Sequence, residues 1–429
     1  MNKELINEIQ GVNPWLEKKE LLAEISSPHY VERQQFSFLM NSEWDELWLI
    51  LVGPRQAGKT TLGKHICQQL VQQGRFPQLL YLNCDLLRIR EWISGIVFLK
   101  EAREYFHLTN FILFIDEVQR LESPGLILKA IHDLKLPCKL IASGSSQLEI
   151  KSKVQEYLTG RHLEAVVLPF SEQELSHYYL EDQLLYGCYP QIVQAKNKTL
   201  LLQQLYNTYI NKDIIEILKI SKSDVMQKLL GLIAHSCGQL VNYQQLAVDC
   251  KVSAPTVQHY LSILEKTYVV QSIQPFVGNK RQELTSNPIY YFIDNGFRNK
   301  LLDNFSPLQQ RSDLGLLVQN YIFQFLIKYQ TQYFKSFKIY YWRTKGGAEV
   351  DFVIYKNDTN IVPIEVKHRS FTTPKITRGF RSFLESYQPK YGLIITKDYY
   401  DKKEVEGCLI EWVPLSDLKR CLLLFEKIL

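Results

Sequence analysis

The sequence of 429 residues has few of the features that mark secreted, zinc-binding or membrane proteins. Its eight cysteines are scattered without Cys-x-x-Cys spacing, which argues against a disulfide framework and against a zinc site. No apolar run approaches the roughly 20 residues of a membrane span. The first residues, Met-Asn-Lys-Glu-Leu, are too polar for a signal peptide. Internal repeats and low-complexity tracts are missing too, so we expect a cytoplasmic protein without a membrane partner.

Charge of one sign is not in large excess either. Fifty Lys and Arg residues stand against 45 Asp and Glu residues, which gives a formal net charge of +5. This balance permits contact with nucleic acid but does not require it, because a dedicated binder usually concentrates its basic residues on one face. The chain is too long for one compact core, so two to four domains are expected.

The chain opens with a helical lead-in over residues 1–45, interrupted at Asn13-Pro14. Short runs that are almost wholly apolar follow, as expected of buried parallel strands, at 47–52, 79–82, 111–115, 139–142 and 165–168. Amphipathic stretches lie between them at 58–73, 91–106 and 123–135. This alternation predicts a three-layer α/β domain with a parallel sheet over residues 46–170.

A glycine-containing loop directly follows the first apolar run and precedes a helix. It matches the Gly-x-x-x-x-Gly-Lys-Thr pattern of phosphate-binding loops and is followed by a second threonine: Gly53, Pro54, Arg55, Gln56, Ala57, Gly58, Lys59, Thr60 and Thr61. In such a loop the backbone N–H groups and the start of the next helix face the phosphates. We therefore predict that these residues bind ATP, with Lys59 on the β- and γ-phosphates and the Thr60 hydroxyl on Mg²⁺.

Two acidic residues end the third apolar run. Asp116 follows residues 111–115 directly and is predicted to hold Mg²⁺, and Glu117 is the candidate general base that orients and polarises the attacking water. A helix N-cap in the next element is the alternative for this pair. The phosphate-binding loop upstream favours the catalytic interpretation.

A single strand at 79–83 lies between the two motifs. With a glutamate after the aspartate, this arrangement resembles the additional-strand class of P-loop ATPases, to which AAA proteins belong, and it implies the strand order 5-1-4-3-2. In that class the next strand ends in a polar sensor of the γ-phosphate, which here is Ser143 or Ser145. A turn that caps the following helix is the alternative for either serine.

Arg161 precedes the fifth predicted strand and is a further candidate for nucleotide contact, within its own chain or across a subunit boundary. The alternative is a surface arginine paired with Glu164.

Residues 171–225 are predicted to be helical, and residues 226–305 to form a winged helix. Helices at 243–250 and 256–265 surround a turn, with Ser253 as N-cap, and strands at 269–275 and 290–293 flank a wing at 278–281. Such a domain commonly binds DNA through its second helix. The exposed positions there are polar and hardly basic, so a module for packing between domains is the alternative.

Residues 306–429 are predicted to form an α/β domain with a long helix at 314–328 and strands at 338–342, 350–355, 361–366 and 391–395. A turn at 356–360 would place Asp351 opposite Glu365 and Glu349 opposite Lys367, all on one face of a hairpin. Facing carboxylates indicate a divalent metal held by Asp351 and Glu365, with Lys367 positioning water or stabilising phosphorane charge. A structural salt-bridge cluster is the alternative. The spacing Asp-x₁₃-Glu-x-Lys is the PD-(D/E)XK nuclease signature.

With these residues in view, the chain over about 48–400 resembles bacterial and archaeal AAA-type ATPases that carry a C-terminal domain long labelled of unknown function. Further segments carry the resemblance: Leu158-Thr159-Gly160-Arg161, Gly187-x-Tyr189-Pro190, Asp294-x-Gly296 and Trp342-Arg343. The resemblance implies an AAA core, a helical segment, a winged helix and a restriction-endonuclease-like domain.

One position departs from the family pattern. The long helix of the last domain usually presents a glutamate in a Gly-x-x-x-Glu-Asn context, and here Gln319 stands between Gly315 and Asn320. A neutral amide ligates a divalent metal more weakly than a carboxylate. The sequence thus favours an Mg²⁺-dependent, ATP-hydrolysing switch coupled to a nuclease-like domain acting on DNA. The alternative is an ATP-gated module, with a DNA or protein partner, whose nuclease-like domain is inactive; an oligomer is compatible with both.

Overall fold

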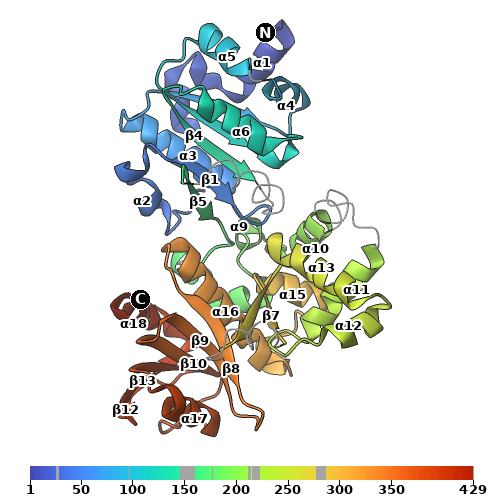
Figure 1. Cartoon of the computed structure of the whole chain (residues 1–429), viewed down its shortest axis with the longest axis vertical. Coiled ribbons are helices and arrows are strands. Elements are labelled where there is room, and N and C mark those ends of the chain that lie inside the picture. Colours follow the sequence, from blue (N-terminus) through green and yellow to red (C-terminus); the bar gives the residue numbers. More distant parts are fainter. Residues whose placement is uncertain are drawn as a thin grey trace. The chain divides into compact units, whose positions relative to one another are not determined.

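The computed structural model describes residues 1–25, 29–95, 97–144, 160–175, 177–210, 214, 223–276 and 287–428. The chain divides into two compact units (Figure 1): Met1–Phe170 with Thr331–Tyr333, and Ser171–Gln330 with Phe334–Leu429. Within the described ranges, no helix combines the length and the apolar character that crossing a membrane requires.

The first unit is built on a five-stranded parallel sheet with the strand order β2-β3-β4-β1-β5. This is the order that the resemblance implied. The strands are β1 (Trp48–Val52), β2 (Gln78–Asn83), β3 (Phe111–Asp116), β4 (Cys138–Gly144) and β5 (His162–Val166). Every residue of β1 and β3 is buried, as the unbroken apolar runs predicted.

The fifth strand lies earlier in the chain than the apolar run at 165–168 predicted. β5 is an edge strand whose first residues, from His162, are only half-buried, so they need not be apolar. The rest of the apolar run continues past the strand. There the Val167 N–H donates a hydrogen bond to the Val52 carbonyl (2.7 Å), next to the start of the phosphate loop.

The helices of this unit include α3 (Lys59–Gln72), α4 (Leu87–Ile93), α5 (Phe98–Phe106) and α6 (Pro124–Asp133). The amphipathic stretch predicted at 91–106 is therefore divided between two helices. The chain turns after α4, where the Gly95 N–H bonds the Trp92 carbonyl (3.3 Å) and ends the helix.

The lead-in covers the free edge of β2. α1 (Lys3–Val12) ends at Asn13, the predicted break. The Asn13 amide takes the place of a neighbouring strand, because its Oδ1 accepts from the Tyr81 N–H (2.6 Å) and its Nδ2 donates to the Tyr81 carbonyl (2.8 Å). Trp15 Nε1 bonds the Leu79 carbonyl (2.9 Å) on the same strand. An edge with its backbone groups satisfied in this way is protected from pairing with other chains.

The second unit begins with helices, as predicted. These are α8 (Leu180–Tyr186), α9 (Pro190–Gln194), α10 (Lys198–Asn207), α11 (Ser223–His235), α12 (Tyr243–Cys250) and α13 (Ala254–Lys266). The Ser253 hydroxyl caps α13 by accepting from the Thr256 N–H (3.3 Å). β6 (Val270–Pro275) and β7 (Ile289–Phe292) follow as an antiparallel pair. The predicted wing at 278–281 lies outside the described residues.

The same unit contains an eight-stranded sheet in the order β12-β13-β11-β10-β9-β8-β6-β7. Its remaining strands are β8 (Lys338–Arg343), β9 (Glu349–Asn357), β10 (Asn360–Lys367), β11 (Tyr391–Thr396), β12 (Asp401–Val405) and β13 (Cys408–Pro414). β6 pairs in parallel with β8 through Gln274 and Tyr340, and through Pro275 and Tyr341. One sheet therefore runs through the segments predicted as the winged helix and as the last domain.

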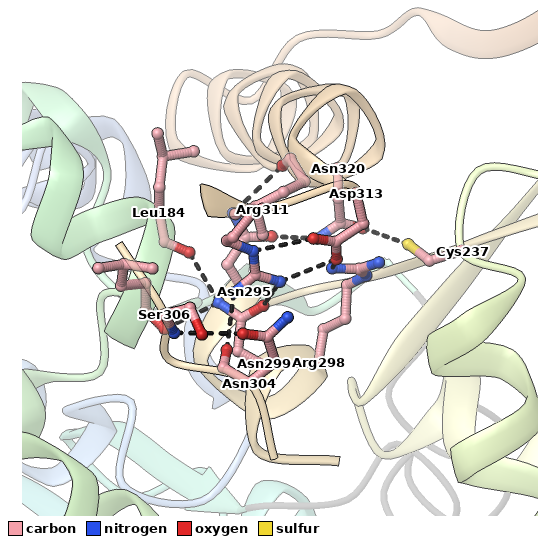
Figure 2. Close-up of polar contacts among 12 residues, drawn as sticks. Leu184, Cys237, Asn295, Arg298, Asn299, Asn304, Ser306, Arg311, Asp313 and Asn320 are labelled. Atoms are coloured by element: carbon pink, nitrogen blue, oxygen red, sulfur yellow. Dashed lines mark hydrogen bonds and ion pairs between the residues drawn. The ribbon is translucent and has the colours of Figure 1, made fainter. Parts of the chain in front are cut away.

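Buried polar contacts join α15 (Asn295–Leu301) to the start of α16 (Leu314–Gln332), as Figure 2 shows. The Asp313 carboxylate accepts from Arg298 Nη1 and from Arg311 Nη2, each at 2.8 Å. Burial alone would raise the pKa of Asp313. The hydrogen bonds and positive charges of the two arginines outweigh burial and lower this pKa to about 2.

Asn320 fixes the rotation of α16 against β7. Its Oδ1 accepts from the Phe292 N–H (2.8 Å), and its Nδ2 donates to the Phe292 carbonyl (3.1 Å). The Nδ2 group also donates to Asn295 Oδ1 (2.6 Å; Figure 2). Because Asn320 is held on both sides of its amide, the direction of the neighbouring Gln319 side chain is set as well.

The Gly-x-Tyr-Pro segment at 187–190 has a packing role. Gly187 has φ 76°, and a Cβ placed there would lie 1.8 Å from Asp294 Oδ1. The buried Asp294 carboxylate accepts from the Cys188 N–H (2.7 Å) and the Gly296 N–H (2.9 Å). Only glycine allows this approach, which explains two of the segments that carry the resemblance.

Candidate functional site

The phosphate loop needs glycine at its first position. Gly53 has φ 145°, and a Cβ there would lie 2.2 Å from the Val167 carbonyl oxygen. Gln56 and Gly58 also have positive φ, 59° and 97°, so the backbone curls between β1 and α3. A loop of this shape directs its N–H groups inward, as an anion site requires.

Lys59 is the first residue of α3 and is buried. Its Nζ donates to the Gly53 carbonyl (3.1 Å) and the Pro54 carbonyl (2.8 Å), so the ammonium group lies against the loop. Arg33, from the lead-in, holds the loop from outside. It donates to the Ala57 carbonyl (3.2 Å) and to the Leu168 carbonyl. Arg33 could not be predicted as a site residue, because a lone arginine in the lead-in belongs to no recognisable motif.

Asp116 ends β3 beside the start of α3. Its carboxylate accepts from Thr60 Oγ1 at 3.0 and 2.9 Å, from Tyr81 OH at 2.9 Å, and from Ser143 Oγ. The two residues predicted to hold Mg²⁺, Thr60 and Asp116, are therefore in direct contact. A hydroxyl and a carboxylate are the oxygen donors that Mg²⁺ prefers. Tyr81 was missed because it looks like an ordinary residue of a buried strand.

Glu117 follows Asp116 with a left-handed backbone, φ 57°, and its side chain receives a hydrogen bond from Gln119 Nε2. It makes no side-chain capping bond to the short helix after it, so the N-cap alternative is not what the structure describes. Burial raises the pKa of Glu117, against the opposing effect of Lys59, and Asp116 adds to the rise. A raised pKa brings a carboxylate closer to the working range of a general base.

The predicted sensor positions have different outcomes. Ser143 is fully buried at the end of β4, and its hydroxyl donates to Asp116, so here it orients the carboxylate. Ser145 lies outside the described residues, as do Leu158 and Thr159.

Arg161 lies at the wrong edge of the sheet for nucleotide contact within its own chain. It precedes β5, whose His162 pairs with Trp48 at the start of β1, whereas the phosphate loop follows the other end of β1 at Val52. Five residues of strand separate the two edges by roughly 16 Å. Arg161 instead approaches the His132 ring nitrogen (3.4 Å). Contact across a subunit boundary stays a prediction.

The C-terminal hairpin has the predicted register. Ile361 pairs with Tyr355, and Ile364 pairs with Phe352. Continued by one residue, this register places Asp351 opposite Glu365. The turn is shorter than predicted, because both strands extend towards it and meet through a register shift at Asn360.

The predicted metal carboxylates are held separately. Asp351 accepts from Gln319 Nε2 (3.1 Å) and from the Val366 N–H (2.7 Å). Glu365 pairs with Lys367 Nζ (3.0 Å) and accepts from Thr377 Oγ1 at 2.8 and 3.0 Å. Asp351 lines a cavity of about 420 Å³, and Glu365 and Lys367 line another of about 530 Å³.

Burial raises the pKa of Asp351 to about 6, although Lys367 and the Val366 N–H lower it. Burial would lower the pKa of Lys367, but Glu365 and Asp351 outweigh burial and raise it. Glu349 lines both cavities. Among the described residues, no group of three or more His, Cys, Asp or Glu side chains is arranged to hold a metal ion. Asp351 and Glu365 supply two carboxylates. At the position of a third ligand, Gln319 turns its N–H₂ group towards Asp351, and this group cannot coordinate a metal ion as an oxygen would.

Three family models match consecutive parts of the chain. The model described as an AAA domain matches residues 45–176. Two domains of unknown function follow, DUF8612 at residues 177–308 and DUF4143 at residues 314–418. The chain therefore carries an AAA domain of the P-loop ATPase family and a DUF4143 domain.

Two relatives are uncharacterised proteins of Mycobacterium bovis and Mycobacterium tuberculosis. Each is 24% identical over 350 residues, which covers 79% of this chain and 74% of the relative. Two solved structures also match at 14% identity over 58% of this chain. They are AMPPCP-bound DnaA from Aquifex aeolicus (92% of that chain, TM-score 0.28) and the replication initiator DnaA bound to AMPPCP and single-stranded DNA (93%, TM-score 0.26). Scores of this size do not establish a shared fold.

Proposed function

We propose that this protein is an Mg²⁺-dependent ATPase that works as a switch, and that its nucleotide state controls a nuclease-like C-terminal domain acting on DNA. The observation that most supports the ATPase part is the contact between Thr60 and Asp116. Their chain neighbours are Lys59 and Glu117. This contact brings the end of β3 to the start of the helix that follows the phosphate loop, where a nucleotide-bound metal has to lie.

The residues of the site have separate tasks. The loop N–H groups and Lys59 hold the phosphates, and Thr60 and Asp116 would hold Mg²⁺. The metal, when bound, neutralises charge that develops on the phosphate oxygens. Glu117 accepts a proton from the water that attacks the γ-phosphorus, while the bond to the β–γ bridging oxygen breaks and ADP leaves with that oxygen. Ser143 and Tyr81 keep Asp116 in one orientation.

The nuclease-like part is supported by the hairpin. Its register brings Asp351 and Glu365 to neighbouring positions, and Lys367 Nζ is 3.0 Å from the Glu365 carboxylate. The pair α12 and α13, followed by the antiparallel strands β6 and β7, supports the winged-helix interpretation and with it a DNA target. Motions driven by ATP turnover commonly have such attached domains as their output.

An assay of phosphate release and DNA cleavage on one sample tests this proposal. Wild type, Lys59→Ala and Asp351→Ala are each measured with and without DNA. We expect Lys59→Ala to lose phosphate release and Asp351→Ala to keep it but to lose cleavage. If DNA neither stimulates phosphate release nor is bound or cut, the DNA target is wrong.

A second candidate is an ATP-gated binding module with an inactive nuclease-like domain. The hydrogen bond from Gln319 Nε2 to Asp351 (3.1 Å) favours it, because the amide occupies one carboxylate oxygen and adds no negative charge. Calorimetric titration of Mn²⁺ into wild type and Asp351→Ala separates the two candidates. Equal and negligible binding in both proteins would sink the nuclease interpretation and leave the ATPase proposal intact.

A further inference from the structure

A stretch that begins with the last two residues of β10 carries basic residues without any acidic ones. Residues 366–384 contain no Asp or Glu, but they include Lys367, Arg369, Lys375, Arg378 and Arg381. The net charge of the whole chain is only +5, so positive charge is concentrated here. Such concentration on one surface is typical of contact with a polyanion.

The fold gathers these residues at one edge of the eight-stranded sheet. β10 and β11 are parallel and end together, because Lys367 pairs with Thr396. The loops that follow them therefore lie side by side. The Lys397 N–H donates to the Arg369 carbonyl (3.3 Å), which joins the two loops directly.

Five exposed cations line the 530 Å³ cavity that contains Glu365 and Lys367 or belong to the loops next to it, and we name them the basic rim: Lys345, Arg369, Lys375, Arg378 and Lys397. Arg378 lines the cavity itself. Lys345 lies between two lining residues, Thr344 and Gly346, and Arg369 and Lys375 are each two residues from one. Lys397 joins the group through its bond to Arg369.

Within the described part of the chain, none of the five basic rim residues is held in an ion pair, although Glu349 lines the same cavity and Asp398 directly follows Lys397. Two other cations of the same stretch are different. Arg381 pairs with Glu406 (3.1 Å) and Lys367 pairs with Glu365 (3.0 Å), so neither is counted in the rim. Unpaired exposed cations can neutralise the phosphates of a nucleic acid, which then releases its condensed counterions.

We propose that the basic rim binds the phosphodiester backbone of a nucleic acid and leads it across the cavity that contains Glu365 and Lys367. The proposal rests on DNA being the target of the C-terminal domain and names the surface that would hold it. It moves the main electrostatic contact away from α13, whose exposed residues Gln258 and His259 are hardly basic.

The distribution of the cations favours a polymer over a single phosphate. They come from three loops and from the first turn of α17 (Arg378–Tyr387), so they follow the edge of the sheet and do not converge on one point. Arg369 also lies over the Phe371 ring, 4.8 Å from its centroid. An arginine stacked on an aromatic ring offers a platform for a base.

The surface chemistry disfavours a lipid membrane. Binding to an anionic bilayer usually combines cations with exposed apolar side chains that enter the interface. Among the described residues, the large exposed hydrophobic side chains include none from 344–397, and Tyr400, three residues beyond Lys397, is the nearest along the chain. A phosphate polymer with accessible bases therefore fits better.

The test measures the salt dependence of binding by the full-length protein. Fluorescence anisotropy of labelled oligonucleotides of about 20 nucleotides, single-stranded and duplex, is followed between about 50 and 200 mM salt. Each phosphate contact contributes a slope of about 0.7 on single strands or 0.9 on duplex, which is roughly five- to eightfold in affinity at 0.1 M salt. Lys375→Ala, Arg378→Ala and the double variant should each lower slope and affinity by these steps, equally for different sequences.

Lys338→Ala is the matched control. Lys338 is an exposed lysine at the start of β8, and it pairs with Tyr355, so it lies at the opposite edge of the same sheet. Its removal should leave the slope unchanged. Circular dichroism and thermal unfolding confirm that every variant is folded before binding is compared.

The outcomes separate the surface from the function. If wild type binds DNA and the double variant keeps the wild-type slope, the basic rim is wrong while the DNA target survives. If wild type binds neither oligonucleotide, both proposals fail. Tighter binding to phosphatidylserine vesicles than to oligonucleotides, lost in the double variant, would assign the rim to a membrane and overturn the proposal.

Discussion

Replacing Asp313 by Asn removes a negative charge from the buried junction between α15 and α16 (Figure 2). In the wild type this carboxylate serves two arginines, Arg298 and Arg311, whose side chains are 1% and 0% exposed. Its own side chain is 20% exposed, so solvent screens the interaction only in part. The pKa of Asp313 is lowered from 3.8 to about 2. At about 1.4 kcal/mol for each unit, that corresponds to roughly 2 kcal/mol of stability at neutral pH.

The pH dependence of this stability contribution follows from the lowered pKa of Asp313. A carboxyl group whose pKa is depressed by folding stabilises the folded state above its ordinary pKa and loses this contribution as the pH falls towards the folded value. The difference between wild type and Asp313→Asn should therefore be constant from pH 7 to about pH 5 and shrink between pH 4 and pH 2. The variant also leaves the two buried arginines without a carboxylate partner, so the loss of stability at neutral pH should be at least this large.

Thermal unfolding at pH 7 measures this prediction, with a fall in Tm of about 5–10 °C for the transition of the second unit. Asp417→Asn is the matched control, because Asp417 pairs with Arg420 at the surface, where both side chains are more than 40% exposed. An exposed pair contributes little, so this variant should shift the Tm by less than about 2 °C. Equal shifts in the two variants would show that the buried Asp313 carboxylate contributes no more stability than an exposed one.

Three further changes test the two sites. Gly53→Ala should weaken ATP binding at least about tenfold, because the loop must move to relieve the clash of the added Cβ with the Val167 carbonyl oxygen. Titration with a fluorescent ATP analogue measures this affinity. An unchanged affinity would contradict the loop geometry. Gln319→Glu should raise Mn²⁺ affinity in calorimetry about tenfold by placing a carboxylate beside Asp351, and no gain argues against a metal site there. Tyr81→Phe should lower kcat about tenfold, because Asp116 loses one of its orienting hydroxyls. ATP binding in EDTA should stay as in wild type. A normal kcat would show that this hydroxyl is dispensable.

Local patterns carried most of the correct predictions. The phosphate loop and the acidic end of β3 were recognisable because each motif is contiguous and is framed by buried strands. The hairpin register followed from a polar turn and period-2 alternation, which fix pairing without distant information. The strand order of the first sheet came from the resemblance, since periodicity does not determine order.

Long-range contacts account for what was missed. β6 pairs with β8 through Gln274 and Tyr340, and neither segment contains a sequence signal that predicts this pairing. Tyr81 contacts Asp116 from a strand and Arg33 contacts the phosphate loop from the lead-in, and in the sequence each looks like an ordinary packing or surface residue. Arg161 was a candidate because it precedes the fifth strand, but the direction of β5 puts it at the edge of the sheet opposite the phosphate loop.

Whether this protein is an Mg²⁺-dependent ATPase is tested by phosphate release from the full-length protein, compared between wild type, Glu117→Gln and Lys59→Ala. We expect Mg²⁺-dependent release by wild type. Glu117→Gln should still bind ATP but release phosphate at least about a hundredfold more slowly, because it cannot accept the proton of the attacking water. Lys59→Ala should lose binding as well as release. Wild-type rates in Glu117→Gln would show that Glu117 is not the general base, and no Mg²⁺-dependent release by wild type would show that the protein is not an ATPase of this kind.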